Sequence, residues 1–310
     1  MRILEKKNEV NSKEMKMKIT LFPGCTVPVR ATNYEMSFRE VAGVLGIEIA
    51  DIESFGCCGY PMMAVSELSA LSMAAYNLQM AEKANLPLVT LCSACSGFLK
   101  EVAFKLESDD KLRGEINKIL LQINPSYSYN GSTLVKHVAR FLVEDIGVEE
   151  ITKKIVRPLK DIKVAIHYGC HFVRPRKLGY SDDPENPESL DRLVHLTGAT
   201  PVPYEGLMDC CGGGILGIKE DSALLIAKRK LDSISAIGVD AIVLICPFCS
   251  VMFEGNQKKI EKIAGKTYEI PVLYYTQLLG LAFGLDAERL GFSMNRIKAK
   301  TILDKILSGF

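Results

Sequence analysis

The chain has 310 residues, of which 48% are hydrophobic and 24% charged, and a mean hydropathy of +0.12. These values are typical of a globular protein and exclude a disordered, fibrous or coiled-coil chain, while the length favours two domains. The 38 basic and 37 acidic residues give a net charge of +1, which disfavours a nucleic-acid-binding protein, and no apolar run approaches the roughly 20 residues of a membrane span.

The N-terminus is polar, with mixed charge and no apolar core, so it does not resemble a secretory signal. We expect residues 1–16 to form a flexible extension, with Met15 or Met17 as an alternative start, and we expect a cytoplasmic location. The next segments alternate between strand and helix patterns. In chain order they are a strand at 18–22, a helix at 33–45, a strand at 47–52, a helix at 64–84 and a strand at 86–91.

The second half repeats this order of patterns. It predicts a strand at 163–166, a helix after Pro187, a strand at 202–204, a helix at 220–237 and a strand at 241–245. Such alternation favours an α/β fold with a small parallel sheet, flanked by helices, in each half. The intervening residues 102–160 have a helical pattern and are interpreted as scaffold and linker. We place the domains at 17–157 and 158–310, with the boundary at Pro158.

The ten cysteines fall into two sets of five, and none is left over. The first set is Cys25, Cys57, Cys58, Cys92 and Cys95; the second set is Cys170, Cys210, Cys211, Cys246 and Cys249. Each set consists of a single cysteine, then a vicinal pair followed by glycine, then a C-x-x-C pair. A repeat of this complexity indicates an internal duplication. Because the cysteines follow predicted strands, each set is expected to converge at the carboxyl edge of its sheet.

Several chemistries use clustered cysteines. Structural zinc takes four ligands, a thioredoxin-like redox pair needs one C-x-x-C, and inert buried cysteines would not repeat their spacing. Cytosolic thiols stay reduced, so a disulfide framework is disfavoured. Soft thiolates also select iron–sulfur clusters, although an ordinary cubane takes four cysteines and a fifth would require an unusual cluster. We therefore favour iron–sulfur binding, with zinc as the alternative.

Each set resembles the CCG domain, and the tandem pair resembles the B subunit of heterodisulfide reductase from methanogenic archaea. The resemblance covers nearly the whole chain and is carried by the segments 22–26 (FPGCT), 56–61 (GCCGYP), 168–171 (YGCH) and 246–249 (CPFC). It implies two Rossmann-like CCG domains. It also implies that each set holds a noncubane [4Fe-4S] cluster, with no flavin or nicotinamide on this chain.

The same resemblance implies an anaerobic role in methanogenesis, namely reduction of the coenzyme M–coenzyme B disulfide to two thiols between the clusters. Electrons would come from a small subunit with two cubane [4Fe-4S] clusters. That subunit would be served by a flavin-containing, electron-bifurcating subunit and by a hydrogenase or formate dehydrogenase. The alternatives are a CCG subunit of thiol:fumarate reductase, of lactate or glycolate oxidase, or of a succinate dehydrogenase-like enzyme, and a metal-stabilised assembly protein without catalysis.

Basic residues near the cysteines are candidates for binding the anionic disulfide, because the arginine fork matches oxyanions. They are Arg30, Arg174, Arg176 and Lys177, whose alternative role is that of solvated surface charges. His171, next to Cys170, is a candidate proton donor. His167 is a second candidate to donate a proton or to hydrogen-bond a cluster sulfur, although we favour its packing on a strand. We expect no chemical role for His137 or His195, which fall within helical patterns.

Overall fold

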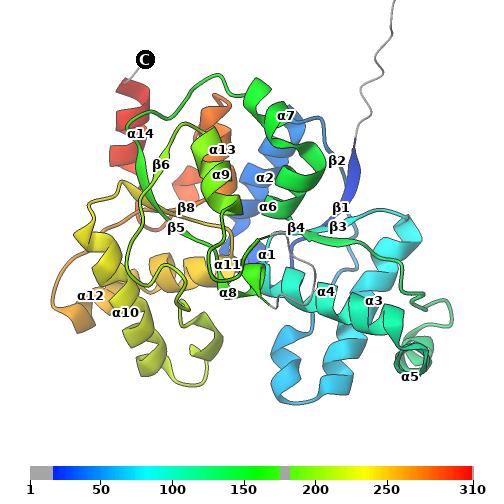
Figure 1. Ribbon diagram of the computed structural model, residues 1–310. Coiled ribbons are helices and arrows are strands. Elements are labelled where there is room, and N and C mark those ends of the chain that lie inside the picture. The colour runs from blue at the N-terminus through cyan, green and yellow to red at the C-terminus, as the bar shows by residue number, and fades with distance from the viewer. Residues whose placement is uncertain (1–16, 175–181, 309–310) are drawn as a thin grey trace, which may run out of the picture.

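The computed structural model describes residues 17–174 and 182–308 and contains two parallel sheets of four strands each (Figure 1). The first sheet has the order β2-β1-β3-β4 and the second β6-β5-β7-β8, so the two sheets repeat one topology. The strands of the first sheet are β1 (Lys18–Phe22), β2 (Glu48–Ala50), β3 (Leu88–Thr90) and β4 (Val135–His137). Those of the second are β5 (Lys163–His167), β6 (Thr200–Pro201), β7 (Ala241–Leu244) and β8 (Val272–Tyr274).

Helices and helical turns connect the strands of the first half. They are α1 (Val27–Arg30), α2 (Thr32–Val44), η1 (Tyr60–Ala64), α3 (Glu67–Ala84), α4 (Ser93–Ser108), α5 (Asp110–Ile123), α6 (Val138–Phe141), η2 (Leu142–Ile146) and α7 (Val148–Lys153). The helix expected at 64–84 is thus split into a 3₁₀ turn and α3. Ser66 causes the division, because its hydroxyl accepts a hydrogen bond from the amide of Ser69 and so caps α3.

The second half has the corresponding elements. They are α8 (Cys170–Val173), α9 (Ser189–Leu196), η4 (Gly213–Ile215), α10 (Glu220–Ala236), α11 (Pro247–Ser250), η5 (Val251–Gly255), α12 (Gln257–Ala264), α13 (Tyr275–Ala282), η6 (Phe292–Met294) and α14 (Lys300–Ser308). The two halves also pack reciprocally, since α2 lies against α13 and α6 lies against α9 in the upper middle of Figure 1. The expected α/β fold with an internal duplication is confirmed.

One strand in each sheet, β4 and β8, is not predicted by the sequence patterns. Both β4 and β8 have only three residues, too few to show a periodic pattern, and each is stabilised by pairing with a buried neighbour, β3 or β7. The interpretation of residues 102–160 as a helical scaffold is therefore wrong at β4. The strand expected at 202–204 is also misplaced, because the paired residues are 200–201 at the sheet edge, where Pro201 is tolerated.

The central strands are buried except for Lys18 and Lys163, the exposed first residues of β1 and β5, as in other parallel sheets covered on both faces. This burial fixes the register of the strands, and their carboxyl ends lead directly into the cysteine motifs. No helix among residues 17–174 and 182–308 combines the length and apolar composition needed to cross a bilayer. The extension predicted at 1–16 lies outside the described residues, and the boundary at Pro158 stays a prediction.

Candidate metal centre

Each single cysteine follows a central strand through a glycine in the left-handed region. Gly24 has φ of +70° and Gly169 has φ of +77°, values that only glycine adopts easily. These turns also bring the backbone close to the other cysteines: a Cβ on Gly24 would lie 3.0 Å from Sγ of Cys95, and one on Gly169 would lie 3.6 Å from Cβ of Cys246. The glycine is therefore needed both for the turn and for the approach of the motifs.

The glycine after each vicinal pair has an equally specific role. Gly59 (φ +93°) and Gly212 (φ +84°) start the turns η1 and η4. A Cβ on Gly59 would lie 2.5 Å from the carbonyl oxygen of Ala70, and one on Gly212 would lie 2.6 Å from that of Ala223. Each vicinal pair is thus held directly against the first turns of the long helix that follows, α3 or α10.

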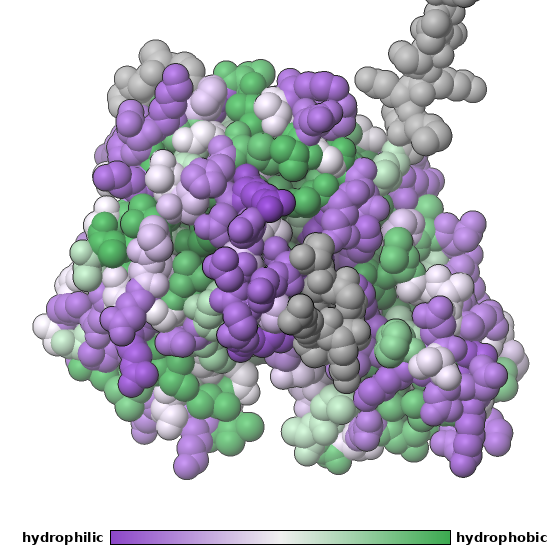
Figure 2. Space-filling model, in the orientation of Figure 1, coloured by the Kyte–Doolittle hydropathy of each residue, from purple (hydrophilic) through white to green (hydrophobic). Residues whose placement is uncertain are grey.

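Both cysteine sets open onto one cavity of about 630 Å³. Nine of the ten cysteines line it, the exception being Cys57. The other lining residues are mostly apolar or small: Pro23, Thr26, Tyr60, Pro61, Met63, Ala64, Ser93, Ala94, Gly169, His171, Gly214, Ile218 and Phe248. Figure 2 shows the surface hollowed at its lower edge, between the lobe with α10 and the lobe with α3 and α4 in Figure 1.

Thiol–thiol interactions connect the cysteines within each set and also connect the two sets. In the first set, Cys25 lies 4.0 Å from Cys57, and Cys58 interacts with Cys95, which interacts with Cys92. The second set mirrors this order, since Cys211 and Cys246 both interact with Cys249, and Cys170 interacts with Cys210. The halves meet where Cys92 interacts with Cys246. The two sets therefore approach each other most directly through these two thiols.

Crowding shifts the pKa values of these thiols in opposite directions. Hydrogen bonds to the neighbouring thiols, together with burial, raise the pKa of Cys95 and of Cys249 well above the usual range. A hydrogen bond from Cys57 lowers the pKa of Cys58 to about 4, and a hydrogen bond from Cys170 lowers that of Cys210. Like charges at this spacing oppose one another, so full ionisation of a set requires a cationic centre among the sulfurs.

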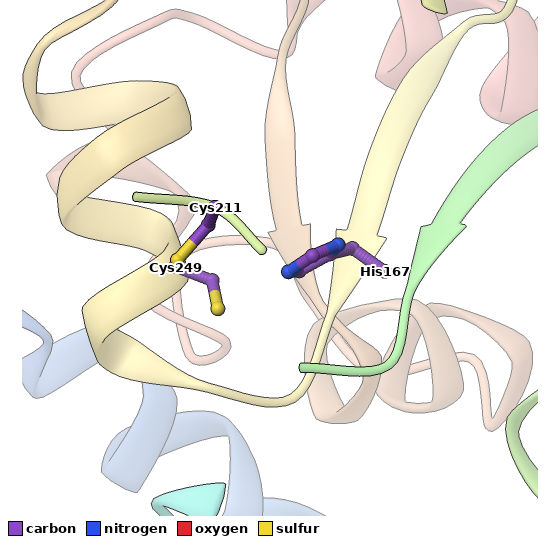
Figure 3. Close-up of side chains that lie close together, drawn as sticks. All are labelled: His167, Cys211 and Cys249. Atoms are coloured by element: carbon purple, nitrogen blue, oxygen red, sulfur yellow. The ribbon is translucent and has the colours of Figure 1, made fainter. Parts of the chain in front are cut away.

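The polar surroundings of the two sets differ. In the second half, His167 ends β5 with its ring directed toward Cys211 and Cys249 (Figure 3), and one potential ligand atom from each of the three lies within 4.8 Å of the others. Lys230, on α10, is buried behind His167. The corresponding positions in the first half, three residues before the first cysteine and nineteen after the vicinal pair, hold Phe22 and Asn77.

The candidate residues outside the cysteine sets lie in different places. His171 lines the cavity, and its ring meets that of Tyr60 edge to face at 4.8 Å. Arg174 is exposed, lies 3.4 Å from Glu185, and lines a small neighbouring pocket rather than the cavity. Arg30 is exposed in another pocket, beside Glu254 and Arg296. Arg176 and Lys177 lie outside the described residues.

The expectation for His137 needs correction. It ends β4 rather than lying on a helix, and it is buried near the centre of the site. Its Nε2 atom lies 3.0 Å from the carbonyl oxygen of Ile245, next to Cys246, and its Nδ1 atom accepts a hydrogen bond from the amide of Ala139. His137 thus positions the second set from within the first half, a role that no local pattern indicates. His195 lies on α9, as the helical pattern predicts.

The donor set fits iron–sulfur binding better than it fits a single metal ion. Each set offers five soft sulfur ligands, of which three are buried. A tetrahedral zinc ion would use four of them and leave one without a role. The cavity gives the sulfurs common access to one space, and positive charge there would favour loss of the protons of Cys95 and Cys249, whose pKa values are raised. The residues present therefore suit an iron–sulfur cluster in each half.

Comparisons with known proteins agree with this chemistry. The cysteine-rich (CCG) domain family matches residues 19–100 and again 164–254. The B subunit of the ferredoxin:CoB-CoM heterodisulfide reductase of Methanosarcina mazei is 35% identical over 293 residues, covering 93% of this chain and 97% of the relative. The 8-methylmenaquinol:fumarate reductase membrane anchor subunit of Wolinella succinogenes is also 35% identical, over 287 residues, covering 92% of this chain and 99% of the relative.

A solved structure shares the fold. A hypothetical protein from Helicobacter pylori superimposes with a TM-score of 0.72 at 15% identity, over 91% of this chain and 52% of that chain. The sequence relatives are matched over almost their whole length, and they are named as subunits of reductases. The chain therefore belongs to the family of heterodisulfide reductase B subunits, tandem cysteine-rich (CCG) domain proteins that are iron–sulfur oxidoreductase subunits.

Proposed function

We propose that the chain is the catalytic subunit of a heterodisulfide reductase, with a noncubane [4Fe-4S] cluster on each five-cysteine set. Its reaction is reduction of the coenzyme M–coenzyme B disulfide to two thiols. The observation that supports the proposal is the cavity, because cysteines of both sets line it and the sets meet at Cys92 and Cys246. A substrate with two adjacent sulfurs suits a site with two equivalent sulfur-rich walls.

The reaction consumes two electrons and two protons for each S–S bond broken. Clusters bound to the two sets would supply the electrons. The residues of this chain bind and orient the disulfide between the two walls, and His171 is the proposed source of a proton. His171 lies in the cavity wall, where its ring meets that of Tyr60 edge to face at 4.8 Å.

Electrons are proposed to enter from another polypeptide. All ten cysteines belong to the two sets, so the sequence has none left for a cubane relay cluster. The proposed partner is a small subunit with two cubane [4Fe-4S] clusters, served by a flavin-containing bifurcating subunit with a hydrogenase or formate dehydrogenase. The relative from Methanosarcina mazei is likewise named as one subunit of an enzyme. A cytoplasmic location belongs to the same proposal, because thiols stay reduced there.

A second candidate function is electron transfer between a quinol and fumarate, as in the enzyme named for the Wolinella succinogenes relative. The composition of the cavity favours this alternative. Its walls include Met63, Ile218 and Phe248, and no lysine or arginine is present among the described residues that line it. An apolar quinol suits such walls better than an anionic disulfide does.

The two functions are separated by an assay of the complex purified anaerobically with its partner subunits. We expect oxidation of reduced viologen to depend on added coenzyme M–coenzyme B disulfide, and two thiols to appear for each pair of electrons. The second candidate would be established if a complex with full iron content did not reduce the disulfide but oxidised a menaquinol analogue with fumarate as the electron acceptor. Zinc in place of iron would exclude both functions.

A further inference from the structure

A buried lysine lies beneath the second cysteine set. Lys230 is 2% exposed, and its Nζ atom donates to the carbonyl oxygens of Asp209 at 2.7 Å and Leu207 at 3.0 Å, and lies 3.2 Å from Nδ1 of His167. An ammonium group has three N–H donors, so this geometry satisfies the charged form completely. Burial lowers the pKa of Lys230 to about 8, which still leaves the charged form dominant at pH 7.

The lysine determines which nitrogen of His167 carries a proton. An ammonium group can only donate hydrogen bonds, so Nδ1 of His167 accepts from Lys230 and carries no hydrogen, which leaves a neutral imidazole with one N–H. Because Nδ1 accepts a hydrogen bond from Lys230, the hydrogen must be on Nε2. Phe253 fixes the plane of the ring, edge to face at 5.0 Å. Nε2 is buried and has no partner among the described protein atoms, yet it is close to the Cys211 and Cys249 sulfurs (Figure 3).

The first half has the same architecture without the charge. Asn77 accepts a hydrogen bond from the amide of Gly56 and donates one to the carbonyl of Cys57, each at 2.9 Å. It therefore holds the loop at its vicinal pair, as Lys230 holds the loop before Cys210. Phe22, in the position of His167, offers no hydrogen-bond donor. The duplicated site thus has one neutral half and one half with a buried cation and an unused N–H group.

We propose that Lys230 and His167 are positioning residues that make the two clusters unequal. His167 donates its Nε2–H to a sulfur of the second cluster and is not a metal ligand, because Lys230 keeps the proton on that nitrogen. Positive charge and hydrogen bonds to sulfur both stabilise the reduced state of an iron–sulfur cluster. The second cluster therefore has the higher reduction potential and is the first to accept an electron. This inference rests on the proposed occupation of both sets by clusters.

The test is a redox titration of the holoprotein followed by EPR, with Cys58→Ser and Cys211→Ser used to assign each signal to its cluster. The variants are Lys230→Met and His167→Phe, the second of which copies the residue of the first half. We expect both to shift the midpoint potential of the second cluster to more negative values and to leave the first unchanged. Lys228→Met, on the same helix but paired with Asp232 near the surface, is the matched control and should shift neither.

Hyperfine spectroscopy tests the role of His167 directly. An exchangeable proton coupled to the second cluster should be present in the wild type and absent in His167→Phe. In His167→Gln, which keeps an N–H donor, the midpoint potential of the second cluster should shift less than in His167→Phe. A strong coupling typical of a coordinated nitrogen would overturn the donor role. If Lys230→Met loses the second cluster, His167→Phe decides the outcome.

The failure of this inference is distinguishable from that of the proposed clusters. If the variants had full iron and both EPR signals but unchanged midpoint potentials, only the role of Lys230 and His167 would be refuted. Half the expected iron and no second signal in the wild type would instead refute the cluster assignment.

Discussion

The buried thiols of Cys92 and Cys246 interact where the two duplicated halves meet. Two hydrogen bonds from the first half support this junction. The hydroxyl of Tyr34 donates to the carbonyl of Ile245 at 3.1 Å, and Nε2 of His137 donates to the same oxygen at 3.0 Å. The backbone that positions Cys246 is thus fixed by the opposite half, so neither half forms its site independently of the other.

The metal content should follow from the two cysteine sets. Protein purified without oxygen is expected to contain about eight irons per chain with a matching amount of sulfide, because each set is proposed to hold four of each. Exposure to air should bleach the visible absorption. Iron, sulfide and zinc are measured in parallel; anoxic reconstitution that leaves only zinc would contradict the assignment.

Both clusters should be needed for turnover. Cys58→Ser and Cys211→Ser each remove one cysteine of a vicinal pair, and oxygen is a poorer ligand for iron–sulfur clusters than thiolate. Each variant is therefore expected to lose its own cluster and all disulfide-dependent oxidation of reduced viologen, while the other cluster stays visible by EPR. If a variant kept substantial activity although its cluster was verifiably absent, the role of that site would be limited to electron transfer.

The glycine after each vicinal pair should tolerate no side chain. In Gly212→Ala the new Cβ would collide with the carbonyl of Ala223 at 2.6 Å, and the positive φ adds strain, together costing about 2 kcal/mol or more. We expect a lower midpoint in urea denaturation and a loss of iron from the second set. Gly214→Ala, in the same motif but with no atom within 4 Å of the new Cβ, is the control. Equal effects of the two substitutions would show that packing at Gly212 is not the cause.

Stability should fall in mildly acidic solution. Burial lowers the pKa of His137 to about 4 from its usual 6.5, so the unfolded chain binds the proton more readily than the folded one. This residue therefore contributes a loss of stability as pH falls from 6.5 toward 4, amounting to about 1 kcal/mol between pH 7.5 and 5.5.

The measurement is anaerobic urea denaturation at those two pH values. His137→Gln keeps groups able to replace both hydrogen bonds but does not titrate, so its stability should depend less on pH. Some dependence should remain, because the pKa of His167 is lowered in the same direction. If the free energy of unfolding changed as much between the two pH values in His137→Gln as in the wild type, His137 would be excluded as a source of the pH dependence.

The sequence alone determined the duplication, the two cysteine sets and the parallel sheets. These features depend on spacing along the chain and on local composition, such as the glycines that follow Cys58 and Cys211 and the buried runs of β1 and β7. The tertiary structure decided that both sets share one cavity, that His137 supports Cys246, and that Arg30 and Arg174 line other pockets. It also decided the pairing of His167 with Lys230, 63 residues apart. Such neighbours come from packing, and three-residue strands such as β4 form only against a buried partner, so no local pattern reveals them.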